Sequence, residues 1–171
     1  INNVGGGGRW GNEIIEETPL ETWEEVFNKN TKTAYTLTMK SIPYMRKKKW
    51  GRVISITSII GKEGGGRPWF SMAKAAQIAF MKSLSKTKYL VRDGITFNCI
   101  APGAIITENN GWQTMKENNI DEFKEISNNL PMGKLGDVND ISNYTSFLIS
   151  EDAKHINGTC LQIDGGESSI Y

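Results

Sequence analysis

Lys74 is the residue in this chain that is best placed for acid–base chemistry. It lies four positions after Phe70 in a stretch predicted to begin a helix, so the two side chains share one helix face. A phenol at position 70 would have its anion stabilised by the Lys74 ammonium, and its pKa would fall toward that of a working general acid or base. Phe70 has no such proton to give. Because a positioned acid–base group contributes about a hundredfold to ten-thousandfold in rate, this absence bears on any activity of the chain.

Ser58 and Asn30 are two further polar residues that could serve the same site. Ser58 follows a short run rich in Val and Ile, residues 52–57, which is apolar on both faces as in a buried parallel strand. Open parallel sheets place their ligands at the carboxyl ends of strands, where the Ser58 hydroxyl could hydrogen-bond a carbonyl or an alcohol. Asn30 lies in the middle of a predicted helix. Taken alone, either residue would be an ordinary turn or surface residue.

The order of these residues resembles the proton relay of the short-chain dehydrogenase/reductase family. That relay uses Asn, Ser, Tyr and Lys, with the last two spaced as Tyr-x-x-x-Lys, and Phe70 stands here at the tyrosine position. Other motifs of the family follow in order and extend the resemblance over almost the whole chain: Pro102-Gly103-Ala104-Ile105-Ile106-Thr107, Pro131-Met132-Gly133 and Asp164-Gly165-Gly166.

The resemblance implies a nicotinamide cofactor, NAD or NADP, and a small-molecule substrate with a carbonyl or alcohol group. By the resemblance, Lys74 would bind the nicotinamide ribose and lower the pKa of the tyrosine. Only the first of these roles remains here, because position 70 is Phe. Asn30 would fix a water molecule beside Lys74. The resemblance further assigns cofactor binding to Asn3, Gly5, Pro102, Gly103, Ile105 and Thr107. It implies no metal.

The start of the chain, Ile1-Asn2-Asn3-Val4-Gly5, resembles the Asn-Asn-Ala-Gly segment that follows the fourth strand of the family. We therefore expect the chain to be a fragment, the C-terminal portion of a Rossmann-like, doubly wound α/β fold. The first strands and the glycine-rich pyrophosphate turn would be absent. Residues 6–11 match G-x-G-x-x-G literally but lack the strand before and the helix after that the fingerprint needs, so a plain glycine loop is the better interpretation.

Hydrophobic periodicity predicts helices and strands in alternation within a single domain, residues 1–171. We expect helices at 19–48, 68–90 and 137–150, and strands at 52–57, 95–100 and 159–163. This alternation predicts a parallel sheet covered on both faces. The motif Thr18-Pro19-Leu20-Glu21 predicts a capping box at the first helix. Residues 107–135, polar and irregular with helical turns near 111–117 and 121–128, are interpreted as the substrate lid.

Composition narrows the function classes. A net charge of +1 gives no reason to expect a nucleic-acid partner, and the basic run 46–49 is interpreted as a solvated helix end rather than a phosphate site. Cys99 and Cys160 lie far apart in the sequence and suggest neither a zinc site nor a disulfide framework. No apolar run is long enough to span a membrane, so a cytoplasmic protein is the default expectation. The lone histidine, His155, is interpreted as a turn residue rather than a hydrolase base.

Two functions therefore remain in view. The first is an NAD(P)-dependent oxidoreductase acting on a carbonyl or alcohol and impaired by Phe70. The second is a catalytically silent relative that binds a dinucleotide or assembles with a partner, with Phe70 filling the tyrosine position as packing. A third interpretation is that Phe70 was introduced deliberately or reflects a sequence change. In either function, the resemblance implies a homodimer or homotetramer formed through the helices at 19–48 and 68–90.

Overall fold

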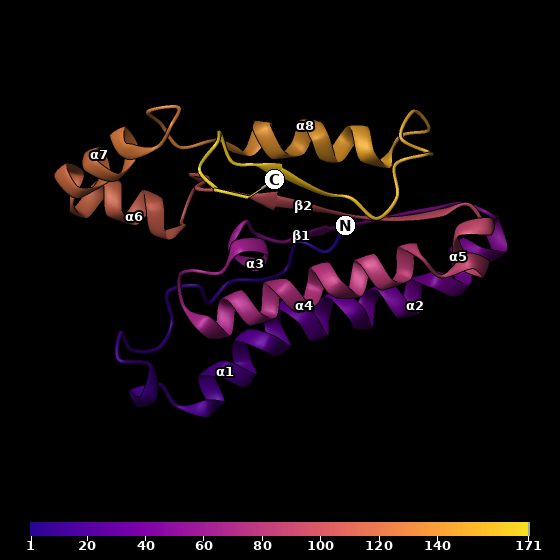
Figure 1. Cartoon of the computed structure of the whole chain (residues 1–171), viewed down its shortest axis with the longest axis horizontal. Helices are drawn as coiled ribbons and strands as arrows, with labels where there is room; N and C mark the ends of the chain where they lie inside the picture. The colour runs from indigo at the N-terminus through magenta and orange to yellow at the C-terminus, as the bar shows by residue number, and fades with distance from the viewer. Residues whose placement is uncertain (171) are drawn as a thin grey trace.

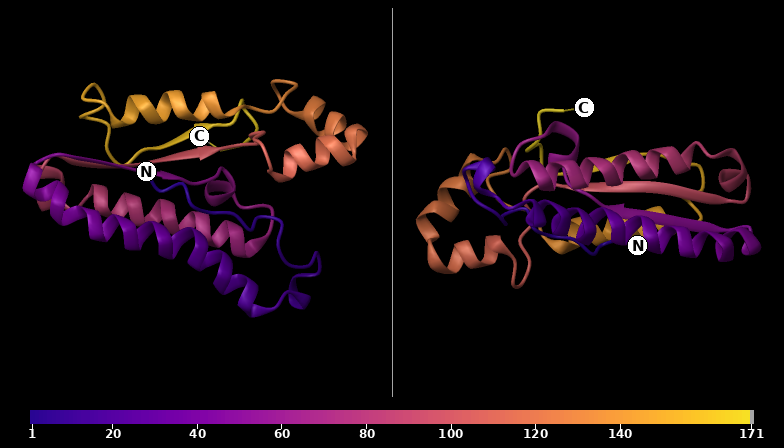
Figure 2. Two further views of the ribbon diagram at one scale, coloured as in Figure 1. Left: turned by 180° about the vertical axis from the view of Figure 1, so that it is seen from behind. Right: turned by 90° about the horizontal axis from the view of Figure 1, so that it is seen from below.

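The computed structural model describes residues 1–170, which form a parallel sheet between two layers of helices. The strands are β1 (Gly51–Ile56), β2 (Ile95–Pro102) and β3 (Cys160–Ile163), in the order β1-β2-β3. One face is covered by α2 (Thr33–Lys48) and α4 (Pro68–Ser85), and the other by α8 (Val138–Ile149) (Figures 1 and 2). The predicted α/β class and the predicted two-sided cover of the sheet are confirmed.

The chain's first residues run beside β1. The Asn2 amide donates to the Ile54 carbonyl at 2.8 Å, and the Ile56 amide donates to the Asn2 carbonyl at 2.9 Å. The buried Asn2 side chain also donates to Thr38 Oγ1 at 2.9 Å, which ties this edge of the sheet to α2. Glycines 5–8 therefore leave the sheet at its ligand-binding end, next to the carboxyl end of β1.

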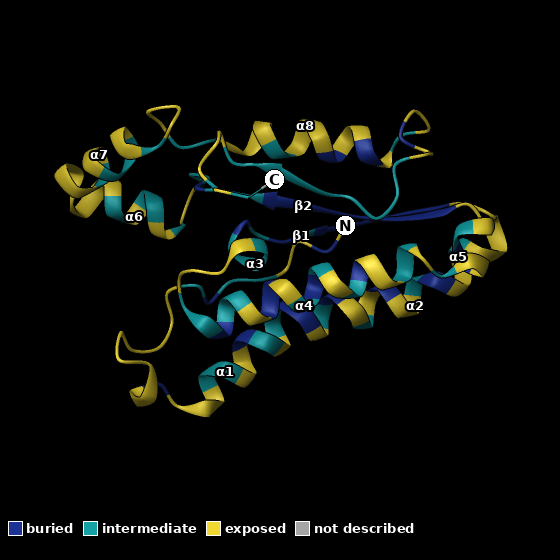
Figure 3. Ribbon diagram, in the orientation of Figure 1, coloured by how far each residue is buried: buried dark blue, intermediate teal, exposed yellow. Residues whose placement is uncertain are grey.

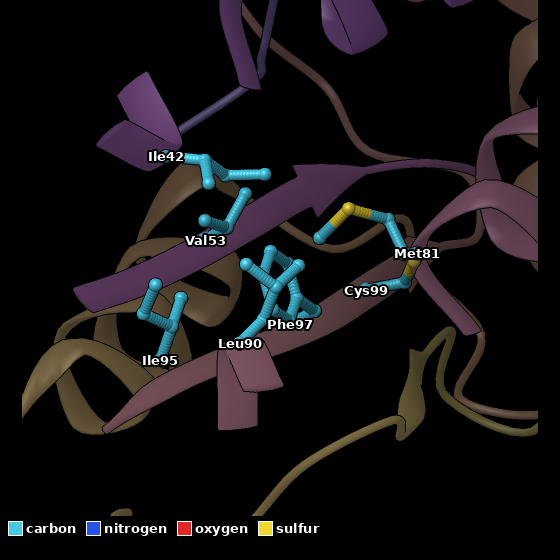
Figure 4. Close-up of a cluster of buried hydrophobic side chains, with 7 residues drawn as sticks. All are labelled: Ile42, Val53, Met81, Leu90, Ile95, Phe97 and Cys99. Carbon is cyan, nitrogen blue, oxygen red and sulfur yellow. The ribbon is translucent and has the colours of Figure 1, made fainter. Parts of the chain in front are cut away.

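The apolar core lies on both faces of the sheet. Strands β1 and β2 are almost wholly buried, as expected for parallel strands with helices on each side (Figure 3). The cluster under α2 and α4 contains Ile42, Val53, Met81, Leu90, Ile95, Phe97 and Cys99 (Figure 4). A second cluster, built around Ile54, Ile100, Leu148 and Ala153, packs α8 onto the opposite face.

The long helix predicted at 19–48 is present but is not uniform. It consists of α1 (Leu20–Phe27), a π-helical turn η2 (Asn28–Lys32) and α2. The predicted capping box is wrong, because the N-cap is Pro19 and no side chain caps it. Thr18 Oγ1 instead accepts a hydrogen bond from the Asn12 amide at 2.8 Å, which holds the preceding loop.

The remaining helices follow the predictions with two differences. The helix predicted at 68–90 is divided into α4 and α5 (Lys88–Arg92), with the Thr87 hydroxyl bonded back to the Ser83 carbonyl at the break. Residues 107–135 are more regular than expected, with α6 (Gly111–Asn118) and α7 (Ile120–Asn129) at the predicted helical turns. The helix predicted at 137–150 is present as α8, and Asp137 caps its N-terminus. Two short helices, η1 (Ile15–Glu17) and α3 (Ile60–Glu63), are the remaining elements. Within residues 1–170, no helix is both long enough and apolar enough to cross a bilayer.

Candidate active site

The start of α4 places Phe70 and Lys74 on one face, toward the sheet and the glycine loop. Pro68 occupies the first turn, where its missing amide costs nothing. Trp69 is fully buried against Trp23 of α1, with ring centroids 5.1 Å apart, and this contact fixes the rotation of α4 about its axis. The predicted i, i+4 placement of Phe70 and Lys74 therefore rests on the adjoining core cluster, against which Phe70 also packs.

Lys74 is a buried cation. Its side chain reaches the end of β1, where Nζ donates to the Ile56 carbonyl at 3.2 Å, and the residue is only 6% exposed. Burial lowers the pKa of Lys74 from 10.5 to about 8, against a smaller opposing effect of the Cys99 sulfur. The ammonium lies 5.5 Å from the centroid of the Phe70 ring, so it meets an aromatic ring where the family relay has a phenol oxygen.

Asn30 lies in the π-helical turn η2 and hydrogen-bonds to the glycine loop. Its side chain accepts from the Gly6 amide at 3.2 Å and donates to the Gly6 carbonyl at 2.8 Å. Its backbone carbonyl also accepts a hydrogen bond from the buried side-chain amide of Gln77 in α4 at 3.0 Å. Single π-helical turns are frequent at functional sites. Here the turn lets one residue hold both the loop and α4.

The glycine loop lies directly against this cluster. A Cβ on Gly5 would stand 2.5 Å from Asn30 Oδ1 and 3.2 Å from Lys74 Nζ, so only glycine allows the backbone to approach so closely. Gly8 approaches the Phe70 ring at ordinary contact distance. Gly5, Asn30, Phe70 and Lys74 are thus brought together, although the first two lie far from α4 in the sequence.

Ser58 lies at the turn between β1 and α3, at the same end of the sheet. It is partly exposed, and its Oγ accepts from the Ile60 amide at 3.3 Å. Gly61 lets α3 pack tightly on α4, since a Cβ there would stand 2.8 Å from the Lys74 backbone. Within residues 1–170, no hydrogen bond joins Ser58 to Asn30, Phe70 or Lys74. Ser58 therefore lies at the predicted edge without a direct link to the relay.

A cavity of about 630 Å³ opens between the end of the sheet and α8. Five residues that the resemblance assigns to cofactor binding line it: Asn3, Pro102, Gly103, Ile105 and Thr107. Ile56 and Ile141 add apolar walls. An apolar slot with a few polar groups suits a flat heteroaromatic amide such as nicotinamide. Gly5 is not among the lining residues and lies with Asn30 instead.

Arg9 and Trp112 close the space above Phe70, a contact that the sequence did not reveal. The Arg9 guanidinium carbon stacks 4.8 Å from the centroid of the Trp112 ring, and Nη1 donates to the Gly111 carbonyl at 3.0 Å. These residues, with Gly8 and Phe70, line a second hollow at the mouth of the site. The start of α6 is thereby held against the glycine loop.

The remaining candidates lie away from this end of the sheet. His155 is exposed and lines a separate hollow with Lys154 and Arg52. In the basic run, Arg46 and Lys49 both pair with Asp93, and these bonds lower the pKa of that carboxyl. Within residues 1–170, no group of three or more His, Cys, Asp or Glu side chains could hold a metal.

Comparison with known proteins gives consistent matches over nearly the whole chain. The family described as enoyl-(acyl carrier protein) reductase matches residues 1–168. The 3-oxoacyl-[acyl-carrier-protein] reductase FabG of Haemophilus influenzae is 38% identical over 148 residues, which is 85% of this chain and 58% of that protein. FabG of Escherichia coli is 34% identical over 147 residues, or 85% of this chain and 57% of that protein. The chain thus spans less than two thirds of the length of these relatives.

Solved structures agree with these matches. A short chain dehydrogenase/reductase family oxidoreductase from Burkholderia thailandensis superposes with a TM-score of 0.86 at 26% identity, over 99% of this chain and 63% of that one. A tyrosine-to-phenylalanine variant of ElxO with NADPH bound superposes with a TM-score of 0.86 at 28% identity, over 98% of this chain and 67% of that one.

Proposed function

Because this chain belongs to the short-chain dehydrogenase/reductase family, we propose that its protein is an NAD(P)-dependent oxidoreductase acting on a carbonyl or alcohol, with a proton relay that lacks its phenol. One observation carries the proposal. Five residues that the resemblance assigns to cofactor binding line a single cavity at the same end of the sheet as Lys74, while the Phe70 ring stands at the position of the family's tyrosine.

In this function the cavity beside α8 holds the nicotinamide. The backbone of Ile105 and the hydroxyl of Thr107 would bind its carboxamide, and Asn3, Pro102 and Gly103 would border it. When bound, the cofactor supplies or accepts the hydride. Lys74 would hold the ribose hydroxyls as a donor-only group. The apolar walls exclude water from the reacting face.

Proton handling then depends on what remains beside Phe70. The Ser58 hydroxyl, at the carboxyl end of β1, would hydrogen-bond the substrate oxygen. Lys74, with a pKa of about 8, is the group in the site that can exchange a proton near neutral pH. Asn30 would be a positioning residue, because its hydrogen bonds hold the glycine loop and the adjoining turn of α4 in place. Turnover should therefore be slow, with the hydride path intact.

The packing of Phe70 also supports the second hypothesis, a catalytically silent protein. Its ring fills the space between Lys74 and Gly8, as a structural residue would. The ElxO variant with NADPH bound supports cofactor binding in a phenylalanine-bearing protein of this fold. The two readings thus differ in turnover rather than in cofactor binding.

Two other features extend the proposal. Residues 107–135 would act as the substrate lid, held by the contact of Arg9 with Trp112. The helix α2 exposes the large apolar side chains Leu37, Met39 and Tyr44, which supports a homodimer or homotetramer formed through α2 and α4. Sedimentation of the protein as a monomer at every accessible concentration would contradict this assembly.

Titration of NADPH and NADH into the protein that carries this chain tests the cofactor site. Thr107→Val and Lys74→Ala should each weaken binding about tenfold, because each removes a polar contact to the nicotinamide half. The exposed His155→Ala is the matched control and should leave affinity unchanged. Equal affinity in all four proteins would contradict the assignment of the cavity.

A further inference from the structure

Cys99 and Cys160 are brought to directly paired positions on neighbouring strands. In the register of β2 and β3, Cys99 is the partner of Cys160. Adjacent strands lie about 4.7–4.9 Å apart, and paired residues point to the same face of the sheet. A disulfide needs a Cα separation of roughly 4.4–6.8 Å. The spacing of the paired strands therefore falls within the Cα range that a disulfide spans.

The side chains of the pair pack together under α4. Both belong to the apolar cluster on that face, and Figure 4 shows Cys99 beside Met81. Cys99 is 1% exposed, whereas Cys160 is partly exposed on β3. One thiol can thus meet a small reagent from solvent, and the other is held beneath it, as in a pair made of an attacking and a resolving cysteine.

The groups that face the pair favour a thiolate at Cys160. Thr57 Oγ1 lies 4.0 Å from Cys160 Sγ, Lys62 of α3 bonds to Gln162 on the same strand at 2.7 Å, and Lys74 faces Cys99 from α4. The neighbouring Cys99 thiol, with Thr57 and the Lys62 charge, lowers the pKa of the Cys160 thiol although burial opposes it. The Cys160 sulfur and burial raise the pKa of Cys99.

We propose that Cys160 and Cys99 form a peroxide-reactive dithiol site, separate from the nicotinamide cavity, that oxidises to a disulfide joining β3 to β2. The Cys160 thiolate attacks one oxygen of hydrogen peroxide, so that an S–O bond forms, the O–O bond breaks, and hydroxide leaves and takes up a proton as water. Cys99 then loses its proton and attacks the Cys160 sulfur. The S–S bond forms as the S–O bond breaks, and a second water leaves. Two thiols lose two electrons, which the peroxide gains.

A structural metal is not an alternative occupant for this pair. Zinc sites of proteins use four ligands or three with an open position. Among residues 1–170 no third His, Cys, Asp or Glu joins the two cysteines. The two sulfurs with a hydroxyl and two lysines nearby suit reversible oxidation of the pair.

Exposure of the reduced full chain to hydrogen peroxide, followed by unfolding in N-ethylmaleimide and intact mass measurement, tests the proposal. We expect a product that is lighter than the reduced protein by two hydrogens, carries no maleimide, and regains two maleimides after dithiothreitol. Survival of both maleimide sites at peroxide doses that oxidise a reference low-pKa thiol would overturn the proposal, as would a disulfide found only between two chains.

Two variants separate the roles of the cysteines and guard against misfolding. In Cys99→Ala, Cys160 should stop at the sulfenic acid, which dimedone traps, and in Cys160→Ser, Cys99 should react at least tenfold more slowly with peroxide. Circular dichroism confirms that each variant is folded. Equal peroxide reactivity of the remaining thiol in the two folded variants would overturn the assignment of Cys160 as the attacking residue.

Discussion

Replacement of Lys74 by methionine should stabilise the fold at neutral pH. Burial lowers the Lys74 pKa from 10.5 to about 8. A tenfold change in an acid constant corresponds to about 1.4 kcal/mol, so keeping this ammonium charged costs the folded state about 3 kcal/mol relative to the unfolded chain. Methionine has a similar length and no charge. Loss of the hydrogen bond to the Ile56 carbonyl offsets about 1 kcal/mol, which leaves a net gain of about 2 kcal/mol.

The pH dependence gives the sign of the effect independently of its size. Between pH 8 and 10.5 the unfolded chain keeps the Lys74 proton and the folded chain does not. The free energy of unfolding of the parent should therefore rise with pH across this window, as the penalty is relieved. The variant lacks this rise, so its advantage over the parent should be fully present below pH 8 and should disappear as pH approaches 10.5.

Urea unfolding followed by tryptophan fluorescence measures this free energy across the pH range. Lys40→Met is the matched control, because Lys40 is exposed on α2 and should change stability by less than about 0.5 kcal/mol at every pH. Parallel pH profiles for the parent and Lys74→Met would refute the reasoning, since they would mean that Lys74 keeps an ordinary pKa in the fold.

Three further outcomes follow from the contacts described. Gly5→Ala should destabilise the fold by about 1–3 kcal/mol, because its Cβ would clash with Asn30, whereas Gly8→Ala, whose Cβ meets only ordinary contact, should be far milder in the same urea experiment. Asp93→Asn should lower stability at neutral pH. Since the Asp93 pKa is lowered in the fold, this difference should shrink as pH falls through that pKa, which a pH series of thermal unfolding checks. Trp112→Ala should loosen the lid and raise KM more than it lowers kcat, and equal changes in both constants would contradict this role.

The sequence predicted the elements wherever short-range signals decide them. The buried strands β1 and β2 appear as short Val- and Ile-rich runs, and Asp137 has the chemistry of a cap. The Thr18 capping box is absent because the Asn12 amide of the preceding loop donates to the Thr18 hydroxyl that the motif would use. Regular helices at 111–118 and 120–129 were underestimated because their composition is polar.

The sequence likewise predicted only those features of the site that depend on local spacing. The i, i+4 spacing of Phe70 and Lys74 is a local property, and it survives in the structure. The closure of Arg9 on Trp112 and the pairing of Cys99 with Cys160 depend on which segments the tertiary fold places side by side. The register between two distant strands cannot be predicted from either segment alone, so the sequence did not show that Cys99 and Cys160 are neighbours.

We propose that the site retains the hydride path and lacks a proton donor at position 70. Restoration of the hydroxyl by Phe70→Tyr, in the protein that carries this chain, tests it most directly, with NADPH consumption measured against a panel of ketones. We expect kcat to rise about a hundredfold to ten-thousandfold, with little change in cofactor affinity. Unchanged or lower turnover in a folded Phe70→Tyr variant that still binds NADPH would contradict it.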